Sequence, residues 1–258
     1  MLYGAIFGDI AGSVYEFDNI KTKDFDIFDE FSFFTDDSVM SIAVACALTE
    51  CRGNYDDLSL KTIKWMKQLG REYPDAGYGG HFAQWLFTQN SEPYNSWGNG
   101  SAMRISAVAY FAKTLEEVKD LSYKVTAVSH NHPEGIKGAE ATAVAIFLAL
   151  QGKSKEEIKE YIVQNYYPIN FTLDKIRPFY VFHSSCQETV PQALEAFFES
   201  ESFEDAIRNA ISIGGDSDTI GAITGSVSEA YYGVPEKMKK FVLEKLDAHL
   251  LEKLQEIE

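Results

Sequence analysis

Cysteine is scarce in this chain of 258 residues, which holds three, and no two of them are spaced as C-x-x-C. An odd, scattered set of cysteines favours neither a disulfide framework nor a structural zinc site. Long apolar runs are also missing, since the longest uncharged apolar stretch, 141–150, is about half of the roughly 20 residues that span a bilayer. We therefore expect a cytoplasmic protein without a transmembrane segment. Its apolar N-terminus lacks a basic leader and contains Asp9, which is typical of a first helix rather than a secretory signal.

The chain has few positively charged residues. It contains 23 Lys and Arg residues and 39 Asp and Glu residues, which give a formal net charge of −16. Such a chain repels a polyphosphate backbone, so general nucleic-acid binding is excluded as the expected function. To bind an anionic small molecule, such a chain needs a site where the electrostatic potential is locally positive. A bound cation, a helix N-terminus or a few basic side chains can provide it. The 45% hydrophobic and 14% aromatic content excludes intrinsic disorder and provides for a sizeable core.

Strand patterns are weak, and apolar residues recur mainly at the three- and four-residue spacing of helices. Segments rich in Ala and Leu at 38–48 and 140–150 predict buried helices. Further helices are predicted at 58–69, 115–128, 155–162, 189–198, 203–213 and 220–232. The partial alternation over 24–34 leaves a strand and an irregular loop both open. We interpret the aromatic run 179–182 as part of the core.

The last segment predicts one strongly amphipathic helix from 235 to 258. Its apolar row consists of Met238, Val242, Leu246, Leu250 and Leu254. This row either packs on its own domain, which we favour, or serves self-association. Because no linker, repeat or low-complexity tract marks a boundary, we expect a single all-α domain over residues 1–258 and a monomer.

Two short acidic blocks come directly before apolar helices: Thr-Asp-Asp-Ser at 35–38 and Gly-Gly-Asp-Ser-Asp-Thr at 214–219. Helix capping by itself explains Asp, Ser or Thr at such positions, but each block holds more acid than one cap uses. If the two N-termini converge, four carboxylates meet, and two unit charges about 4 Å apart cost about 4 kcal/mol at an effective dielectric of about 20. Cations would relieve this repulsion. Oxygen ligands suit Mg²⁺, Mn²⁺ or Ca²⁺ rather than zinc, so capping and a two-metal centre are the two interpretations.

Three further segments stand out. Gly8 and Gly12 are four residues apart, which on a helix allows close packing, and Glu16 is either a surface acid or part of a site. The glycine-rich segment 98–104 suits a phosphate cradle, with a plain loop and helix start as the alternative. The histidines in 129–133 lack a third soft ligand at a suitable spacing, which argues against zinc.

Together these segments resemble the ADP-ribosylglycohydrolase family. The family's opening pattern is similar to Gly8, Asp9, Gly12, Glu16 and Phe17, and its T-D-D-[ST] and G-G-D-[ST]-D-T-x-[GA] motifs are similar to 35–38 and 214–221. Segments 98–104 and 129–133 resemble two more of its motifs, with Ser129 where Thr is common. These ordered matches extend over most of the chain.

The resemblance implies a compact orthogonal multi-helix bundle that holds two Mg²⁺ or Mn²⁺ ions. The implied metal ligands are Thr35, Asp36, Asp37, Asp216, Asp218 and Thr219. The implied catalytic residues are Glu16, Asp36, Asp37 and Asp216. The implied substrate-binding residues are Gly98, Asn99, Gly100, Ser101, Met103, Arg104, Tyr78 and His130.

The activity implied by the resemblance is metal-dependent removal of ADP-ribose from an acceptor, by cleavage of the glycosidic bond at the distal ribose. The expected partner is an ADP-ribosylated protein or a small ADP-ribose conjugate, with arginine as the first acceptor and serine-linked ADP-ribose or O-acetyl-ADP-ribose as alternatives. A non-catalytic ADP-ribose-binding relative and a two-metal phosphate-ester hydrolase are the other hypotheses. Acceptor choice is expected to depend on the loops 21–32, 72–80 and 166–184.

Overall fold

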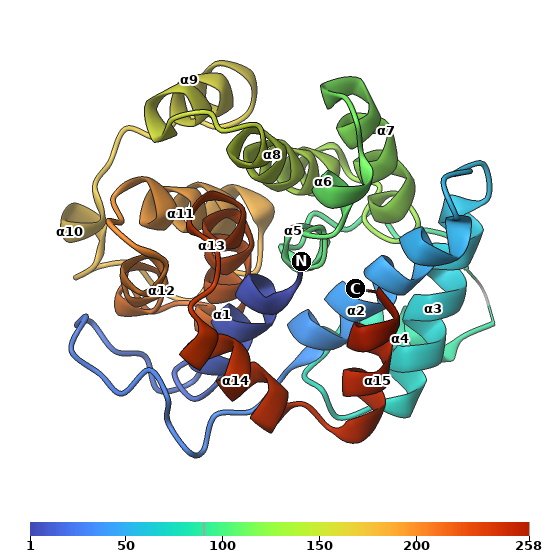
Figure 1. The fold of residues 1–258 in the computed structure, drawn as a ribbon, viewed down its shortest axis with the longest axis horizontal. Helices are drawn as coiled ribbons and strands as arrows, with labels where there is room; N and C mark the ends of the chain where they lie inside the picture. Colours follow the sequence, from blue (N-terminus) through green and yellow to red (C-terminus); the bar gives the residue numbers. More distant parts are fainter. Residues whose placement is uncertain (90, 258) are drawn as a thin grey trace.

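The computed structural model describes residues 1–89 and 91–257, and every regular element in that part of the chain is a helix (Figure 1). The helices are α1 (Tyr3–Ser13), α2 (Asp36–Cys51), α3 (Leu58–Glu72), α4 (Gly80–Phe87), α5 (Gly100–Met103), α6 (Val108–Phe111), α7 (Leu115–Thr126), α8 (Pro133–Leu150), α9 (Lys155–Asn165), α10 (Leu173–Ile176), α11 (Cys186–Phe198), α12 (Phe203–Ser212), α13 (Ser217–Tyr232), α14 (Glu236–Lys245) and α15 (Ala248–Ile257). The predicted all-α class is confirmed, and segment 24–34 is an irregular loop.

The three cysteines of the chain are free and buried. Across the described ranges, no helix combines the length and the apolar character that crossing a membrane requires.

Local sequence sets the ends of the two helices that follow the acidic blocks. Thr35 caps α2, because its hydroxyl accepts a hydrogen bond from the Asp37 N–H at 3.3 Å. Helix α13 begins after Asp216 and ends at Gly233, whose φ of 73° lies in the left-handed region that glycine tolerates. Both acidic blocks therefore lie at the N-termini of long helices.

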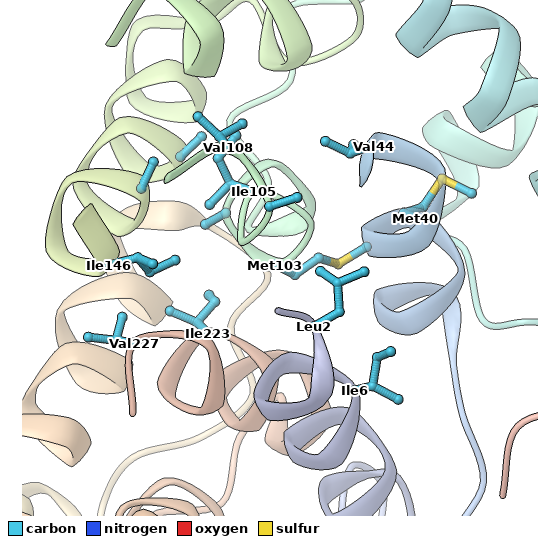
Figure 2. Close-up of a cluster of buried hydrophobic side chains, with 14 of the residues drawn as sticks. Leu2, Ile6, Met40, Val44, Met103, Ile105, Val108, Ile146, Ile223 and Val227 are labelled. Carbon is cyan, nitrogen blue, oxygen red and sulfur yellow. The ribbon is translucent and has the colours of Figure 1, made fainter. Parts of the chain in front are cut away.

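Helix α1 lies between α13 on one side and α2 on the other (Figure 1). The buried core is shared among these helices, α8 and the segment around α5 and α6. Figure 2 shows this for Leu2, which precedes α1, and for Ile6 of α1, Met40 of α2, Ile146 of α8 and Ile223 of α13. Burial of such side chains contributes roughly 1.5–3 kcal/mol each. The core thus fixes the relative positions of the helices that carry the acids.

Helices α1 and α13 approach so closely that glycine is required at their contact. A Cβ added at Gly8 would lie 2.0 Å from the carbonyl oxygen of Gly221, and one added at Gly12 would lie 2.3 Å from that of Ser217. The predicted close packing of Gly8 and Gly12 is confirmed. It brings α1 directly against the beginning of α13, where Asp218 lies.

The prediction of one continuous C-terminal helix is wrong. Helix α14 ends at Lys245, Leu246 has an extended ψ of 144°, and α15 starts at Ala248. The Asp247 carboxylate explains the break, because its Oδ1 accepts hydrogen bonds from the N–H groups of His249 and Leu250 and so begins a new helix. All five apolar residues of the predicted row are nevertheless buried within the chain. The predicted end of the helix, Glu258, lies outside the described residues.

The interpretation of 179–182 as core is also wrong, except at one position. Tyr180 is buried and donates its hydroxyl to the backbone oxygen of Glu188 at 2.6 Å. Phe179, Val181 and Phe182 are exposed. The segment lies between α10 and α11 without helical structure, so neighbouring side chains point in different directions.

Candidate metal centre

The N-termini of α2 and α13 meet in the interior of the molecule. The Thr219 hydroxyl of α13 donates to Asp37 Oδ2 of α2 at 3.1 Å, although the two residues are far apart in sequence. Asp37, Asp216 and Asp218 are all buried. The convergence of the two acidic blocks, assumed from the sequence, is therefore confirmed.

Among the described residues, two groups of three acids bring their carboxylate oxygens within 4.8 Å of one another. One group contains Asp9, Asp37 and Asp218, and the other contains Glu16, Asp216 and Asp218. Asp218 belongs to both groups, which is the arrangement expected of a carboxylate between two adjacent cations. Hard divalent cations prefer such all-oxygen donor sets.

The protein alone does not compensate the charge of this cluster. Burial, reinforced by the charge of Asp218, raises the pKa of Asp37 and of Asp216 well above the usual range. Burial and Asp218 also raise the pKa of Glu16 to about 7. In addition, Asp37 Oδ1 is buried and makes no hydrogen bond to any described residue. An orphaned carboxylate oxygen among acids is a fitting ligand for a cation.

Asp9 is a member of the cluster that the sequence did not single out as a site residue. Its Oδ2 accepts hydrogen bonds from the backbone N–H groups of Thr35 at 3.0 Å and Ser38 at 3.1 Å, and from the Ser38 hydroxyl. Its Oδ1 accepts from the Thr35 hydroxyl at 2.7 Å. With these bonds, Asp9 anchors the start of α2 to α1. An acid inside the otherwise apolar helix at 3–13 was the signal in the sequence.

Asp36 is close to the cluster but faces a different neighbour. Its N–H donates to the backbone oxygen of Ala76 at 2.8 Å, and a Cβ added at Gly77 would lie 3.4 Å from Asp36 Oδ1. Asp36 is outside both groups of three acids and is partly exposed. Through its backbone N–H, Asp36 therefore connects the start of α2 to the loop before α4.

A cavity of about 550 Å³ opens beside the acids, a size typical of small-molecule sites. It is lined by all six predicted metal ligands: Thr35, Asp36, Asp37, Asp216, Asp218 and Thr219. It is also lined by seven of the other predicted residues: Glu16, Gly98, Asn99, Gly100, Met103, Arg104 and His130. Ser101 and Tyr78 are not among its lining residues. Ser101 is buried and donates to the backbone oxygen of Gly135 at 2.8 Å, and Tyr78 packs against Phe82.

The glycine-rich segment connects this cavity to the acids. The Asn99 side-chain amide donates to Asp216 Oδ2 at 2.7 Å and to the Thr189 hydroxyl at 3.2 Å. The Asn99 N–H donates to the backbone oxygen of Ser184 at 2.8 Å, which holds the loop against the segment before α11. Asn99 thus orients one of the predicted metal ligands. The helix that follows, α5, is only one turn long.

Arg104 and His130 form a buried pair at the wall of the cavity. Arg104 is 1% exposed, and its Nη2 donates to the Ser129 hydroxyl at 2.7 Å and contacts His130 Nδ1 at 3.3 Å. The Ser129 hydroxyl also lies 2.9 Å from this Nδ1. Because a guanidinium can only donate, we assign Nδ1 as the acceptor of both contacts and the imidazole proton to Nε2. Burial and the charge of Arg104 lower the pKa of His130 well below 6.5, so the ring is neutral. A Cβ added at Gly98 or Gly100 would lie 3.5 Å from Nε2, which places this donor at the glycine loop.

Several cavity residues were not predicted as site residues from the sequence. Among them are Phe17, Phe33, Asp75, Tyr94, Ser96 and Phe182. Asp75 and Phe182 belong to two of the loops in which we expected the acceptor to be recognised. Phe17 belongs to the family's opening pattern. Phe33, Tyr94 and Ser96 lie near the recognised motifs, and only this proximity could have indicated them.

Comparison with solved structures finds the same fold. An ADP-ribosylglycohydrolase-related protein complex superposes with a TM-score of 0.70 at 21% identity, covering 98% of this chain and 93% of the other. Similar curated proteins include the ADP-ribosylhydrolase ARH3 of Gallus gallus, 25% identical over 90% of this chain and 84% of the relative.

Two bacterial proteins are similar as well. The ADP-ribosylarginine hydrolase Tri1 of Pseudomonas putida is 28% identical over 93% of this chain and 72% of the relative. The ADP-ribosyl-[dinitrogen reductase] glycohydrolase of Rhodospirillum rubrum is 27% identical over 78% of this chain and 70% of the relative. The family model for ADP-ribosylglycohydrolase matches residues 1–257. This match over nearly the whole chain, together with the fold and the acidic centre, establishes that the chain belongs to the ADP-ribosylglycohydrolase family.

Proposed function

We propose that this protein is a dinuclear metal-dependent hydrolase that releases ADP-ribose from ADP-ribosylated arginine. The observation that carries the proposal is the convergence of two acid-bearing helix N-termini beside a cavity whose wall also contains a glycine-rich loop. Membership of a family of ADP-ribosyl hydrolases supports the same reaction class.

Two Mg²⁺ or Mn²⁺ ions would be held by Thr35, Asp36, Asp37, Asp216, Asp218 and Thr219. The orphaned oxygen of Asp37 and the shared position of Asp218 fit such ligands. When bound, the ions would supply Lewis-acid stabilisation and lower the pKa of water at the site. Asp9 and Asn99 would keep the donor set in place, since one anchors the start of α2 and the other orients Asp216.

Cleavage at the anomeric carbon develops positive charge on the ribose ring, which a facing carboxylate stabilises. Glu16 fits this role best, because it is partly exposed, lines the cavity and lies within the group formed with Asp216 and Asp218. Asp36, Asp37 and Asp216 would contribute by holding the metals, and one of them would also orient the attacking water.

The pyrophosphate of ADP-ribose would lie along Gly98 and Gly100, where the absence of side chains lets an anion approach the backbone. The neutral His130 would donate from Nε2 at this loop, and Arg104 would hold that tautomer. Met103 and Asn99 complete this side of the cavity. Tyr78 would contribute by packing on Phe82, which itself lines the cavity.

Arginine is the acceptor that the charge of the cavity favours. Six of the described residues that line it are acids, and two of them, Glu16 and Asp75, are not among the proposed metal ligands. Arg104 is the one Lys or Arg among these lining residues, and it is buried. A guanidinium leaving group is attracted to such a wall, and a similar bacterial protein is named as an ADP-ribosylarginine hydrolase. Serine-linked ADP-ribose and O-acetyl-ADP-ribose are the alternative substrates.

The test is release of free ADP-ribose from three matched substrates: ADP-ribosyl-arginine, a serine-ADP-ribosylated peptide and O-acetyl-ADP-ribose. We expect the highest kcat/KM for the arginine conjugate in the presence of Mg²⁺. A preference for the serine or O-acetyl substrate would replace the proposed acceptor. Binding of ADP-ribose without turnover of any of the three would identify a non-catalytic relative.

A further inference from the structure

Three of the residues that line the cavity are exposed phenylalanines, and we call Phe17, Phe33 and Phe182 the aromatic rim. They line the same cavity although they come from three separate segments, after α1, before α2 and before α11. Their side chains are 89%, 55% and 48% exposed, respectively. Single exposed apolar residues are ordinary, but a group of them around one opening is typical of an interaction site.

The aromatic rim lies close to the acids that line the cavity. Phe17 follows Glu16, and Phe33 is two residues before Thr35. Phe182 follows Val181, whose backbone oxygen would be 3.2 Å from a Cβ added at Gly215, the neighbour of Asp216. The rim is therefore next to the acids at which the proposed cleavage takes place.

The described residues that line the cavity beside the rim carry more negative than positive charge. The exposed Asp75 and the partly exposed Glu16 line the same cavity, and none of the described lining residues contributes an exposed Lys or Arg. Aromatic faces beside carboxylates attract ammonium and guanidinium groups. The net charge of −16 extends the same preference over a longer range. An acidic partner would be repelled from this surface.

The proposed reaction determines what must lie over the rim. If ADP-ribose occupies the cavity with its distal ribose at the acids, an arginine attached to it continues outward through the opening. When that arginine belongs to a protein, the surrounding protein surface is held at the rim. We propose that the aromatic rim and Asp75 dock the surface of an ADP-ribosylated protein that carries further Lys or Arg residues beside the modified arginine. This inference rests on the proposed arginine-linked substrate.

The test compares three substrates: ADP-ribosyl-arginine itself, a peptide with ADP-ribosylated arginine between lysines, and the same peptide with glutamates in their place. We expect the wild-type protein to prefer the lysine-flanked peptide to the glutamate-flanked one by about tenfold in kcat/KM at low salt, with the preference shrinking as salt is added. Asp75→Asn is expected to reduce that preference.

Phe17→Ala, Phe33→Ala and Phe182→Ala test the rim, and Phe→Trp at each position tests whether an aromatic face suffices. We expect the ratio of kcat/KM for the lysine-flanked peptide over ADP-ribosyl-arginine to fall about tenfold for the most affected alanine variant and to be restored by tryptophan. Phe87→Ala is the matched control, because Phe87 is similarly exposed on α4 but does not line the cavity. It should leave the ratio at the wild-type value.

Unchanged ratios in all three alanine variants would overturn the inference, as would equal turnover of the two peptides. A weakened Kd for free ADP-ribose in the rim variants would also overturn it, because the rim would then hold the nucleotide. Failure of the proposed function gives a separate result, since wild-type protein would then release no ADP-ribose from ADP-ribosyl-arginine itself.

Discussion

Individual side chains in this site act mainly by fixing one another. Asp9 holds the start of α2 through four hydrogen bonds, and Asn99 fixes Asp216 through one. Neither role can be deduced from residue type and spacing, because each depends on a partner far away in sequence. The sequence does indicate which segments contain the acidic residues of the site, because Asp and Thr directly before apolar helices can be recognised without knowledge of the fold.

The contact between Arg104 and His130 allows a testable prediction about the protonation of the His130 ring. Since the pKa of His130 is held well below 6.5, the folded protein should keep a neutral ring with its proton on Nε2 between about pH 6 and 8. Below pH 6.5 the unfolded chain binds the extra proton, so this group makes folding less favourable as pH falls. Imidazole nitrogen NMR checks the prediction, and a titration midpoint near 6.5 would contradict it.

Substitutions at His130 test what that proton does. His130→Phe removes the Nε2–H donor and should raise the Kd for ADP-ribose about tenfold or more, as expected for a lost hydrogen bond to a charged group. His130→Gln keeps a donor near that position and should bind more tightly than His130→Phe. Equal affinity of His130→Phe and the wild-type protein, measured by titration calorimetry, would exclude a contact with the ligand.

At the level of helices, the site depends on how closely α1 and α13 pack. The sequence predicted a close contact through Gly8 and Gly12 but could not identify the partner helix, because partner choice is decided by the whole core. The break at Asp247 was missed for a related reason. A regular i+4 row continues through it, whereas a capping carboxylate decides where the new helix begins.

Gly8→Ala tests the helix contact. The new Cβ would meet the backbone of Gly221 at 2.0 Å, so we expect a loss of more than about 3 kcal/mol in the free energy of unfolding, at the upper end for overpacked cores. Gly80→Ala is the matched control, because no atom lies within 4 Å of its added Cβ and its φ is not in the left-handed region. It should be neutral or stabilising by up to about 1 kcal/mol. Similar urea denaturation midpoints for the two variants would contradict this account of the contact.

At the scale of the whole molecule, this strongly acidic chain buries several of its carboxylates together in the acidic cluster. The composition indicated that an anion can bind only where the electrostatic potential is locally positive. A cation held by the acidic cluster would provide such a site. The fold class and the segments that carry the acidic cluster could be predicted from sequence. The aromatic rim could not, because its three members come from segments far apart in sequence, and only Phe17 belongs to a recognised motif.

Metal binding should therefore stabilise the folded chain. At a Mg²⁺ concentration about 100 times the Kd, the gain is about 2.7 kcal/mol, which corresponds to a rise in Tm of roughly 5–10 °C for a chain of this length. Asp218→Asn should lose most of this rise. In chelator it should be at least as stable as the wild-type protein, because one of several mutually repelling buried carboxylates is gone. A Tm that does not respond to Mg²⁺ or Mn²⁺ would contradict the assignment of the cluster as a metal centre.

The central claim is that the acids shared by α1, α2 and α13 form a metal centre that hydrolyses an ADP-ribosyl bond. Its most direct test is the rate of ADP-ribose release from ADP-ribosyl-arginine by wild-type protein and Asp218→Asn, each with Mg²⁺ and with chelator. We predict turnover by the wild-type protein in Mg²⁺, its loss in chelator, its recovery when Mg²⁺ is returned, and a decrease of at least about a hundredfold in kcat for Asp218→Asn. Wild-type turnover that persists in chelator, or an Asp218→Asn variant with wild-type kcat, would contradict the claim.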